Sequence, residues 1–258
     1  MLLPKRKGEM RYNDKSIISV GEMLKALKRQ ASLGTMVWFR GQSVARWQLV
    51  PSLAPDPNHL KAEAALQKRF MQNAIPHLER TPTEEWEWMF MMQHHRAPTR
   101  LLDWSESPLT ALYFAVNEDR HVKKDAAVWC LEPTALNVEA RIAEFEFDNE
   151  IPAFGVDKVL DNYLPSRVDA SPAIMSPVAI MGPRNTARMA AQLGVFTINH
   201  RLHTPIEKIG AAKHAWRLII PSSAKKDIRN ELALLGITAL TLFPELDRVA
   251  DLARELLQ

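Results

Sequence analysis

The stretch QHHRAPTRLLDWSESP, residues 93–108, crowds two histidines, two arginines, two acids and several hydroxyl or amide side chains into one short segment. Apolar segments with helical spacing enclose it on both sides. Burying so many polar groups between two core-forming segments is costly unless the groups satisfy one another or bind a ligand. We therefore expect the fold to be built around this stretch, which should act as an internal hydrogen-bonded brace and also line a site.

The segments beside this stretch carry helix signals. Before it, Thr83 is a suitable N-cap for a helix with an apolar stripe over residues 86–90. After it, Ser107 followed by Pro108 is typical of a helix start. The residues that come next, 109–116, are small and apolar and should be buried. Both helices are thus expected to pack against the core.

The remaining elements follow from periodicity and caps. Ser19 and Glu22 have the spacing of a capping box, which predicts a helix that ends near Gly34. Apolar runs predict strands at 36–39, 47–50, 126–131, 178–181, 195–199, 216–220 and 237–242. Further helices are expected at 58–75, 156–164, 185–193, 223–235 and 246–257. These elements predict one α+β domain over residues 19–258, preceded by a polar N-terminal arm over residues 1–18.

The composition is that of an ordinary globular protein. The 258 residues are 47% hydrophobic and 24% charged. No apolar run reaches the roughly 18 residues that a membrane-spanning helix needs, and the N-terminus has no secretory pattern. The single cysteine, Cys130, lies in an apolar run and should pack as a small core residue. We expect a cytoplasmic protein that does not engage a membrane.

The charge balance is mildly basic. The net charge is +3 and the sequence pI is about 9.0. Lysine and arginine are spread along the chain, not massed in a tail. Such a balance permits an anionic ligand or a nucleic acid without requiring either.

Four motifs occur together and point to a family. Phe39-Arg40-Gly41-Gln42 follows an apolar run, and the central stretch lies at 93–109. Arg188 and the segment 191–197 come later, followed by the segment 242–247. This combination resembles the FRG domain, a bacterial family named for a Phe-Arg-Gly motif, and the likeness runs from about residue 19 to the C-terminus. Arg96 departs from the family pattern, which usually has glycine after the two histidines.

The layout more distantly resembles that of ADP-ribosyltransferases, which release nicotinamide from NAD and transfer ADP-ribose to an acceptor. In that fold a first strand carries an arginine, as in Phe39-Arg40-Gly41. A Ser/Thr pair precedes a helix rich in alanine and aromatics, as in residues 105–115. A third strand usually carries a glutamate, where this sequence offers Gln192.

The resemblance implies a central, mostly antiparallel, split sheet flanked by helices, with NAD as substrate and no metal. It also implies a macromolecular acceptor, with RNA and DNA as candidates. The biological role that it suggests is a bacterial toxin or phage-defence effector with an antitoxin or chaperone partner.

The chemistry assigns roles to particular side chains. An arginine fork such as that of Arg40 suits a diphosphate, and Gly41 would let the backbone approach the ligand. Free N–H groups at the helix start behind Ser107 suit an anion. The expected NAD-binding residues are Arg40, Gly41, Gln42, Thr99, Arg100, Asp103, Trp104, Ser105 and Ser107. The expected catalytic residues are Arg40, His95, Gln192 and Glu245.

A carboxylate near the ribose would stabilise the positive charge that develops when the glycosidic bond breaks. Without a third-strand glutamate, the sequence leaves this role open among Glu106, Glu245 and Asp103.

Other interpretations compete with these roles. Arg40 or Arg100 can simply form a structural ion pair with Asp103. His94 and His95 point in different directions on a helix, so at most one should face a site. The two histidines with Asp103 and Glu106 could hold a metal in a hydrolase, although their spacing matches no common zinc pattern. A non-catalytic module that binds nucleic acid or protein is the main alternative to an enzyme.

Overall fold

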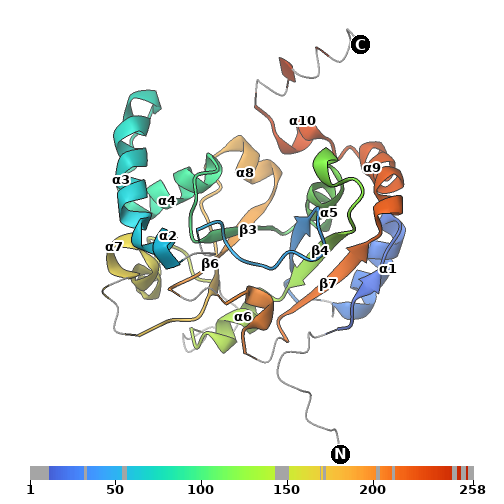
Figure 1. Ribbon diagram of the computed structural model, residues 1–258, viewed down its shortest axis with the longest axis horizontal. Helices are drawn as coiled ribbons and strands as arrows, with labels where there is room; N and C mark the ends of the chain where they lie inside the picture. Colours follow the sequence, from blue (N-terminus) through green and yellow to red (C-terminus); the bar gives the residue numbers. More distant parts are fainter. Residues whose placement is uncertain are drawn as a thin grey trace, which may run out of the picture.

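The computed structural model describes residues 12–31, 34–53, 57–142, 151–168, 170, 173–201, 204–210, 213–245, 249–250 and 254. Most of the helix predicted at 246–257 therefore lies outside the described residues. The protein is α+β, with a mixed seven-stranded sheet whose strand order is β1-β7-β4-β2-β3-β6-β5 (Figure 1). All neighbouring strands are antiparallel except β1 and β7, which are parallel.

The bounds of the strands are β1 Lys15–Ser16, β2 Trp38–Gln42, β3 Leu101–Ser105, β4 Ala126–Leu131, β5 Val178–Ile180, β6 Gly194–Ile198 and β7 Ala215–Ile220. The α-helices are α1 Val20–Gln30, α2 Pro57–Lys61, α3 Glu63–Ala74, α4 Glu85–His94, α5 Pro108–Val116, α6 Pro133–Glu139, α7 Pro165–Val168, α8 Ala187–Ala191, α9 Lys225–Leu234 and α10 Ala239–Leu242. Short 3-10 helices cover Ile75–His77, Asp119–His121, Lys158–Tyr163, Ile206–Lys208 and Ser222–Ala224.

The sheet opens between its two central strands. β2 pairs with β4 along its whole length, from Trp38↔Leu131 to Gln42↔Ala127. β2 pairs with β3, by contrast, only at Phe39↔Ser105. Beyond that pair the two strands diverge, and their facing backbone groups need other partners. The candidate site is built around this opening.

Helices α1, α5 and α9 cover one face of the β7-β4-β2 half of the sheet (Figure 1). The caps predicted from the sequence are confirmed, since Ser19 Oγ accepts the Glu22 N–H and Ser107 Oγ accepts the Thr110 N–H. Cys130 is fully buried in this core, as expected.

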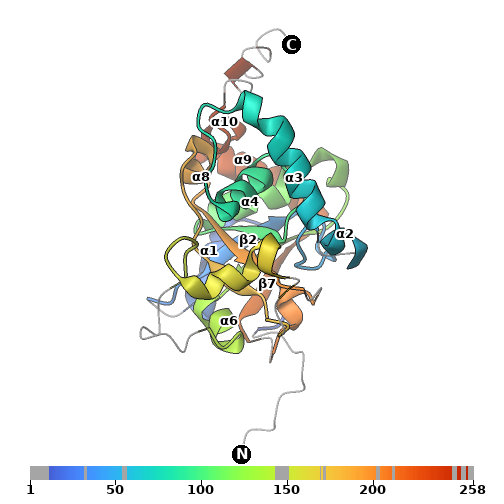
Figure 2. The ribbon, with the colours of Figure 1, turned by 90° about the vertical axis from the view of Figure 1, so that its left-hand side faces the viewer.

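Helices α3 and α4 lie over the β3-β6-β5 half of the sheet (Figure 2). Met89 and Phe90 of α4 pack there with Leu160 and Tyr163 against Phe196 of β6. The cap of α4 differs from the prediction. Thr83 is not the N-cap, because Glu84 takes that place in a capping box with Glu87.

Several predicted elements differ from the structure. Residues 47–50 form no strand. Residues 237–242, predicted as a strand, contain helix α10, because Thr238 and Thr241 cap one another in a capping box. Residues 101–105 form a strand that was not predicted, since polar side chains interrupt its apolar pattern.

The arm expected over residues 1–18 is docked from residue 15 onward, because Lys15–Ser16 pairs with β7 and Ile17 is fully buried. Among the helices that the structure describes, none is long and apolar enough to cross a membrane.

Candidate functional site

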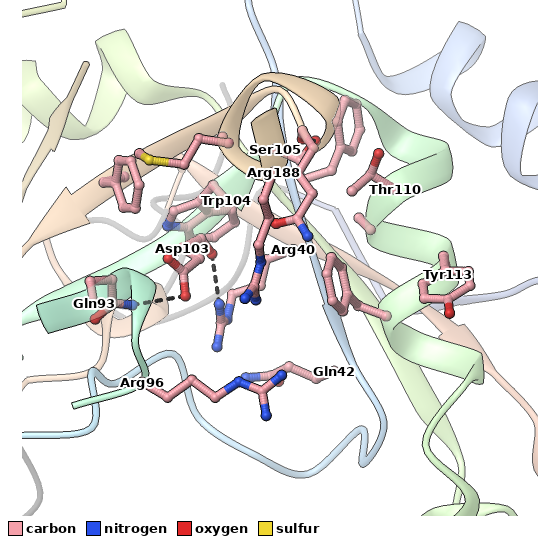
Figure 3. Close-up of a pocket in the computed structure, with 18 of the residues that line it drawn as sticks. Arg40, Gln42, Gln93, Arg96, Asp103, Trp104, Ser105, Thr110, Tyr113 and Arg188 are labelled. Atoms are coloured by element: carbon pink, nitrogen blue, oxygen red, sulfur yellow. Dashed lines mark hydrogen bonds between the residues drawn. The ribbon is translucent and has the colours of Figure 1, made fainter. Parts of the chain in front are cut away.

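A cavity of about 650 Å³ lies where β2 and β3 diverge. Residues of β2, β3, α4, α5, α8 and the segment after α10 line it. Its lining combines three arginines with amide, hydroxyl, carboxylate and aromatic side chains (Figure 3). A cavity of this size and mixed polarity is typical of small-molecule sites.

Arg40 of β2 bridges the opening in the sheet. Its Nη1 donates to the backbone carbonyl of Asp103 at 2.7 Å, so the guanidinium replaces a strand-to-strand contact (Figure 3). Arg40 Nε is buried and has no hydrogen-bond partner within the described part of the chain. Burial lowers the pKa of the Arg40 guanidinium, and the nearby Asp103 carboxylate opposes this effect. An arginine remains charged in proteins, so the cavity holds a cation with an unused donor.

Asp103 of β3 presents its carboxylate to the same cavity. Its Oδ2 accepts a hydrogen bond from Gln93 Nε2 at 2.8 Å, and Gln93 Oε1 in turn accepts one from the Thr99 hydroxyl. Thr99 is buried and does not line the cavity. Its function in the structure is to fix the amide that orients Asp103.

Two further arginines line the cavity. Arg96 follows α4 with a left-handed backbone, φ 61°. Arg188 comes from α8, and its guanidinium carbon lies 4.9 Å from the centre of the Phe243 ring. Figure 3 shows Arg40 of β2, Arg96 of the turn after α4 and Arg188 of α8 extending toward the same space. The cavity therefore favours an anionic ligand.

Aromatic rings form part of the wall. Trp104 is buried, and its indole N–H donates to the Thr197 hydroxyl at 3.0 Å. Tyr113 and Phe114 of α5 lie close to Phe243, with ring centroids 6.5 and 5.8 Å away. Such surfaces suit the planar rings of a nucleotide.

Several polar lining residues are already engaged within the protein. Ser105 Oγ donates to the Gln192 carbonyl at 2.6 Å and accepts the Ser107 N–H at 2.9 Å. Gln192 Nε2 donates to the Leu242 carbonyl at 2.9 Å, and Gln42 Oε1 accepts the Trp129 indole N–H at 2.9 Å. These groups hold the wall of the cavity together.

The structure brings most of the predicted site residues together. The members that line the cavity are Arg40, Gly41, Gln42, Asp103, Trp104, Ser105 and Gln192. The members that do not line it are Thr99, Arg100, Ser107, His95 and Glu245. Ser107 is occupied as the cap of α5.

Arg100 is a structural residue, and the ion pair expected between it and Asp103 is wrong. Arg100 is fully buried, and its Nε donates to both carboxylate oxygens of Glu63 at 2.8 Å. Its other nitrogens donate to the carbonyls of Asn199, at 2.7 Å, and Tyr163. With its donors used in this way, Arg100 is a brace between α3 and the sheet.

One histidine faces the cavity, as expected, but it is His94 and not His95. His94 lines the cavity, whereas His95 is exposed and lies near Phe70, with 6.5 Å between the centroids of the two rings. Burial lowers the pKa of His94, with smaller contributions from His95 and Arg188 and an opposing one from Glu245. His94 is therefore neutral at neutral pH and is able to accept a proton.

Gly41 also has a packing role that the sequence did not predict. A Cβ atom on Gly41 would lie 1.9 Å from the Ala111 carbonyl oxygen and 2.7 Å from the Ala115 nitrogen. Glycine is thus required so that α5 can pack directly on β2. This packing positions the wall that α5 contributes to the cavity.

The structure does not assemble the residues considered for a metal site. Glu106 forms an ion pair with Arg184 and does not line the cavity. Within the described ranges, no three His, Cys, Asp or Glu side chains gather as metal ligands do.

The sequence analysis missed part of the lining. Tyr113 and Phe114 belong to an apolar helix, and Phe243 directly follows the run that was predicted as a strand, 237–242. Arg188 was part of a quoted motif but received no role. Only knowledge of the fold brings these residues together, because α8 and α10 come late in the chain.

The fold and the site define an α+β protein with a cavity, lined by three arginines, in the opening of its sheet. The family model of the FRG domain matches residues 35–124, which include Arg40 and Asp103, and confirms the resemblance over that segment. No curated protein and no solved structure was found to match the chain.

Proposed function

We propose that the cavity binds NAD and that the protein transfers ADP-ribose from it to a macromolecular acceptor. The observation that carries this proposal is the position of the acid Asp103 among three arginines that line the cavity in the opening of the sheet. Arginines suit the diphosphate of a dinucleotide, and an acid is needed where positive charge develops on the ribose.

The arginines supply the binding part of this function. Arg40 has a buried Nε without a partner among the described residues, so a diphosphate oxygen would satisfy it. Its Nη1 is already held by the Asp103 carbonyl, which fixes the direction of the fork. The rings of Tyr113, Phe114 and Phe243 offer a surface for a base.

Asp103 is the best candidate for the acid among the three that the sequence left open. Glu106 is paired with Arg184, and neither Glu106 nor Glu245 lines the cavity. The Asp103 carboxylate lies inside the cavity, where Gln93 orients it. Its negative charge would stabilise the transition state as the bond to nicotinamide breaks and the bonding electrons leave with the base.

The acceptor must lose a proton as it forms the new bond to the ribose. We assign this proton to His94, which lines the cavity and whose lowered pKa keeps it neutral at neutral pH. Arg188, which contributes to that lowering, would meanwhile face the anionic ligand.

The test is incubation of the full chain with NAD labelled in its adenosine part, together with separate pools of RNA, DNA and protein. We expect nicotinamide release and transfer of label to one pool. Arg40→Ala should lower both by about 10- to 100-fold, since it removes a charge-assisted contact. Arg40→Lys keeps the charge but loses the planar fork, and should recover only part of the activity.

Absence of nicotinamide release in every pool would contradict the proposal. A rise in melting temperature with RNA or DNA but not with NAD would favour the non-catalytic binding module instead.

A further inference from the structure

A serine in the lining of the cavity forms a hydrogen-bonded pair with a histidine. Ser43 directly follows β2 and lines the cavity, and its hydroxyl oxygen lies 2.9 Å from Nδ1 of His121. When Nδ1 is the ring nitrogen without a proton, the Ser43 hydroxyl donates to it. In this arrangement the imidazole can take the hydroxyl proton while the oxygen attacks an electrophile.

A buried lysine fixes the two residues of this pair relative to each other. Nζ of Lys225, at the start of α9, donates to the Ser43 carbonyl at 3.0 Å and to the His121 carbonyl at 2.8 Å. Lys225 is buried, and burying an ammonium group is costly unless hydrogen bonds compensate. The Trp47 ring stands perpendicular to that of His121, with 5.1 Å between the centroids. The contact between the hydroxyl and the imidazole is therefore set by the packing around it.

The other serines of the cavity lining are engaged differently. Ser52 and Ser105 also line the cavity. Ser52 Oγ accepts the Thr99 N–H at 3.3 Å. Ser105 Oγ donates to the Gln192 carbonyl at 2.6 Å, and a carbonyl oxygen is too weak a base to remove that proton. Among the described serines of the lining, Ser43 is thus the one whose hydroxyl contacts an imidazole.

Ser43 lies within reach of a dinucleotide held at Arg40. It comes shortly after Arg40 in the chain, at a separation of about 10 Å along an extended strand. In NAD the nicotinamide ribose is joined directly to the diphosphate, for which the guanidinium fork of Arg40 is suited. Ser43 is only 6% exposed, so its hydroxyl is open to the cavity and hardly to the outer surface. A ligand in the cavity of the same molecule can therefore reach this serine, whereas one bound to another molecule cannot.

We infer that Ser43 accepts ADP-ribose within its own chain, with His121 as the base. The inference rests on the proposed function and names an acceptor for it, in addition to the external acceptor whose proton goes to His94. The hydroxyl proton passes to His121 Nδ1 while the Ser43 oxygen bonds to C1′ of the nicotinamide ribose. The bond between C1′ and the nicotinamide nitrogen breaks, and its electrons leave with nicotinamide. His121 is partly exposed, so it can release the proton to solvent.

The experiment is incubation of the full chain with labelled NAD and no other acceptor, followed by proteolysis and mass spectrometry to locate the ADP-ribose. The wild type should carry ADP-ribose on Ser43. The rate of labelling per chain should not change when the protein is diluted, because the reaction occurs within one molecule. His121→Gln keeps a side chain that can form a hydrogen bond but cannot take the proton, and should slow labelling by about 100-fold.

The controls separate this reaction from other attachment. Ser43→Ala should lose the label. The matched variant Ser52→Ala also removes a serine hydroxyl from the cavity lining, and should keep the label on Ser43. Free ADP-ribose in place of NAD should leave Ser43 unlabelled, since it has no nicotinamide to release.

The outcomes are distinct. Nicotinamide release without ADP-ribose on Ser43, or labelling of Ser43 by free ADP-ribose, would overturn this inference and leave the proposed function standing. Labelling of His121→Gln at the wild-type rate would overturn the role of His121 as the base. Failure to release nicotinamide, with or without other acceptors, would overturn the proposed function and this inference with it.

Discussion

Arg40 and Arg100 both lie near carboxylates in the centre of the protein, yet they use their donors very differently. Arg100 is fully buried and donates to Glu63 and to two backbone carbonyls. Among the described residues Arg40 makes one hydrogen bond, to the Asp103 carbonyl, and its buried Nε, which lies beside the cavity, has no partner there. An arginine whose three nitrogens all donate to groups of the protein is a brace, whereas one with a buried nitrogen that lacks an acceptor beside a cavity is suited to bind a ligand.

The largest effect should be the loss of stability when Arg100 is removed. Arg100→Ala removes the ion pair that Arg100 makes with the buried Glu63 carboxylate, and should lower the free energy of unfolding by about 3–5 kcal/mol. Denaturation in urea measures this change. The control is Arg80→Ala, which breaks the exposed ion pair with Glu87 and should cost less than about 1 kcal/mol. Equal effects of the two changes would remove the distinction between Arg100 and a surface arginine.

The open region should respond in activity and not in stability. Asp103→Asn keeps an oxygen for the Gln93 hydrogen bond but removes the charge, and should slow nicotinamide release by about 100- to 1000-fold. Glu106→Gln changes a nearby acid that does not line the cavity and should keep the wild-type rate within a few fold. Full activity of Asp103→Asn would show that another group acts as the acid.

The packing beside the opening is tested at Gly41. Gly41→Ala places a methyl group against the backbone of α5 and should cost about 1–3 kcal/mol of stability as the helix moves. Gly21→Ala is the matched change, because its nearest contact is the Ser19 Oγ at 3.8 Å. That change should raise stability by up to about 1 kcal/mol, since alanine is the better helix former. Unfolding in urea compares both variants, and a neutral Gly41→Ala would mean that α5 does not need so close an approach.

The smallest effect concerns pH. The folded protein holds the pKa of His94 below its ordinary value, so as the pH falls through about 6.5 the unfolded chain takes up a proton that the folded protein resists. The free energy of unfolding therefore decreases toward acid, and His94→Gln should weaken that decrease. Urea denaturation at about pH 7.5 and about pH 5.5 measures it. A pH dependence identical to that of the wild type would show that His94 is not held neutral.

The fold was predictable where local signals agree with packing. The caps at Ser19 and Ser107 and the apolar run at 126–131 gave correct elements, because each signal acts within a few residues. Strand β3 was missed, since the polar residues that form the site interrupt its pattern. The strand predicted at 237–242 contains a helix, because a Thr238–Thr241 capping box outweighs β-branched composition.

The site was predictable in part for the same reason. The arginine after a strand and the polar stretch at 93–108 were recognisable from residue type alone. The partner of Arg100 was not, because Glu63 lies 37 residues away and its helix must first dock. Which of His94 and His95 faces the cavity depends on the rotation of α4 about its axis. Helix caps and the apolar stripe in the sequence do not determine that rotation to within one residue.

The part of the cavity lining that comes last in the chain has a consequence for synthesis in the cell. Phe243 and the Leu242 carbonyl, which holds Gln192, come after every strand of the sheet, since β7 ends at Ile220. A growing polypeptide emerges from the ribosome N-terminus first, so the sheet can form while this wall is still absent. A nascent chain interrupted before residue 242 would lack the Phe243 side of the cavity and the carbonyl that holds Gln192, so the complete lining exists only once the chain extends past these residues.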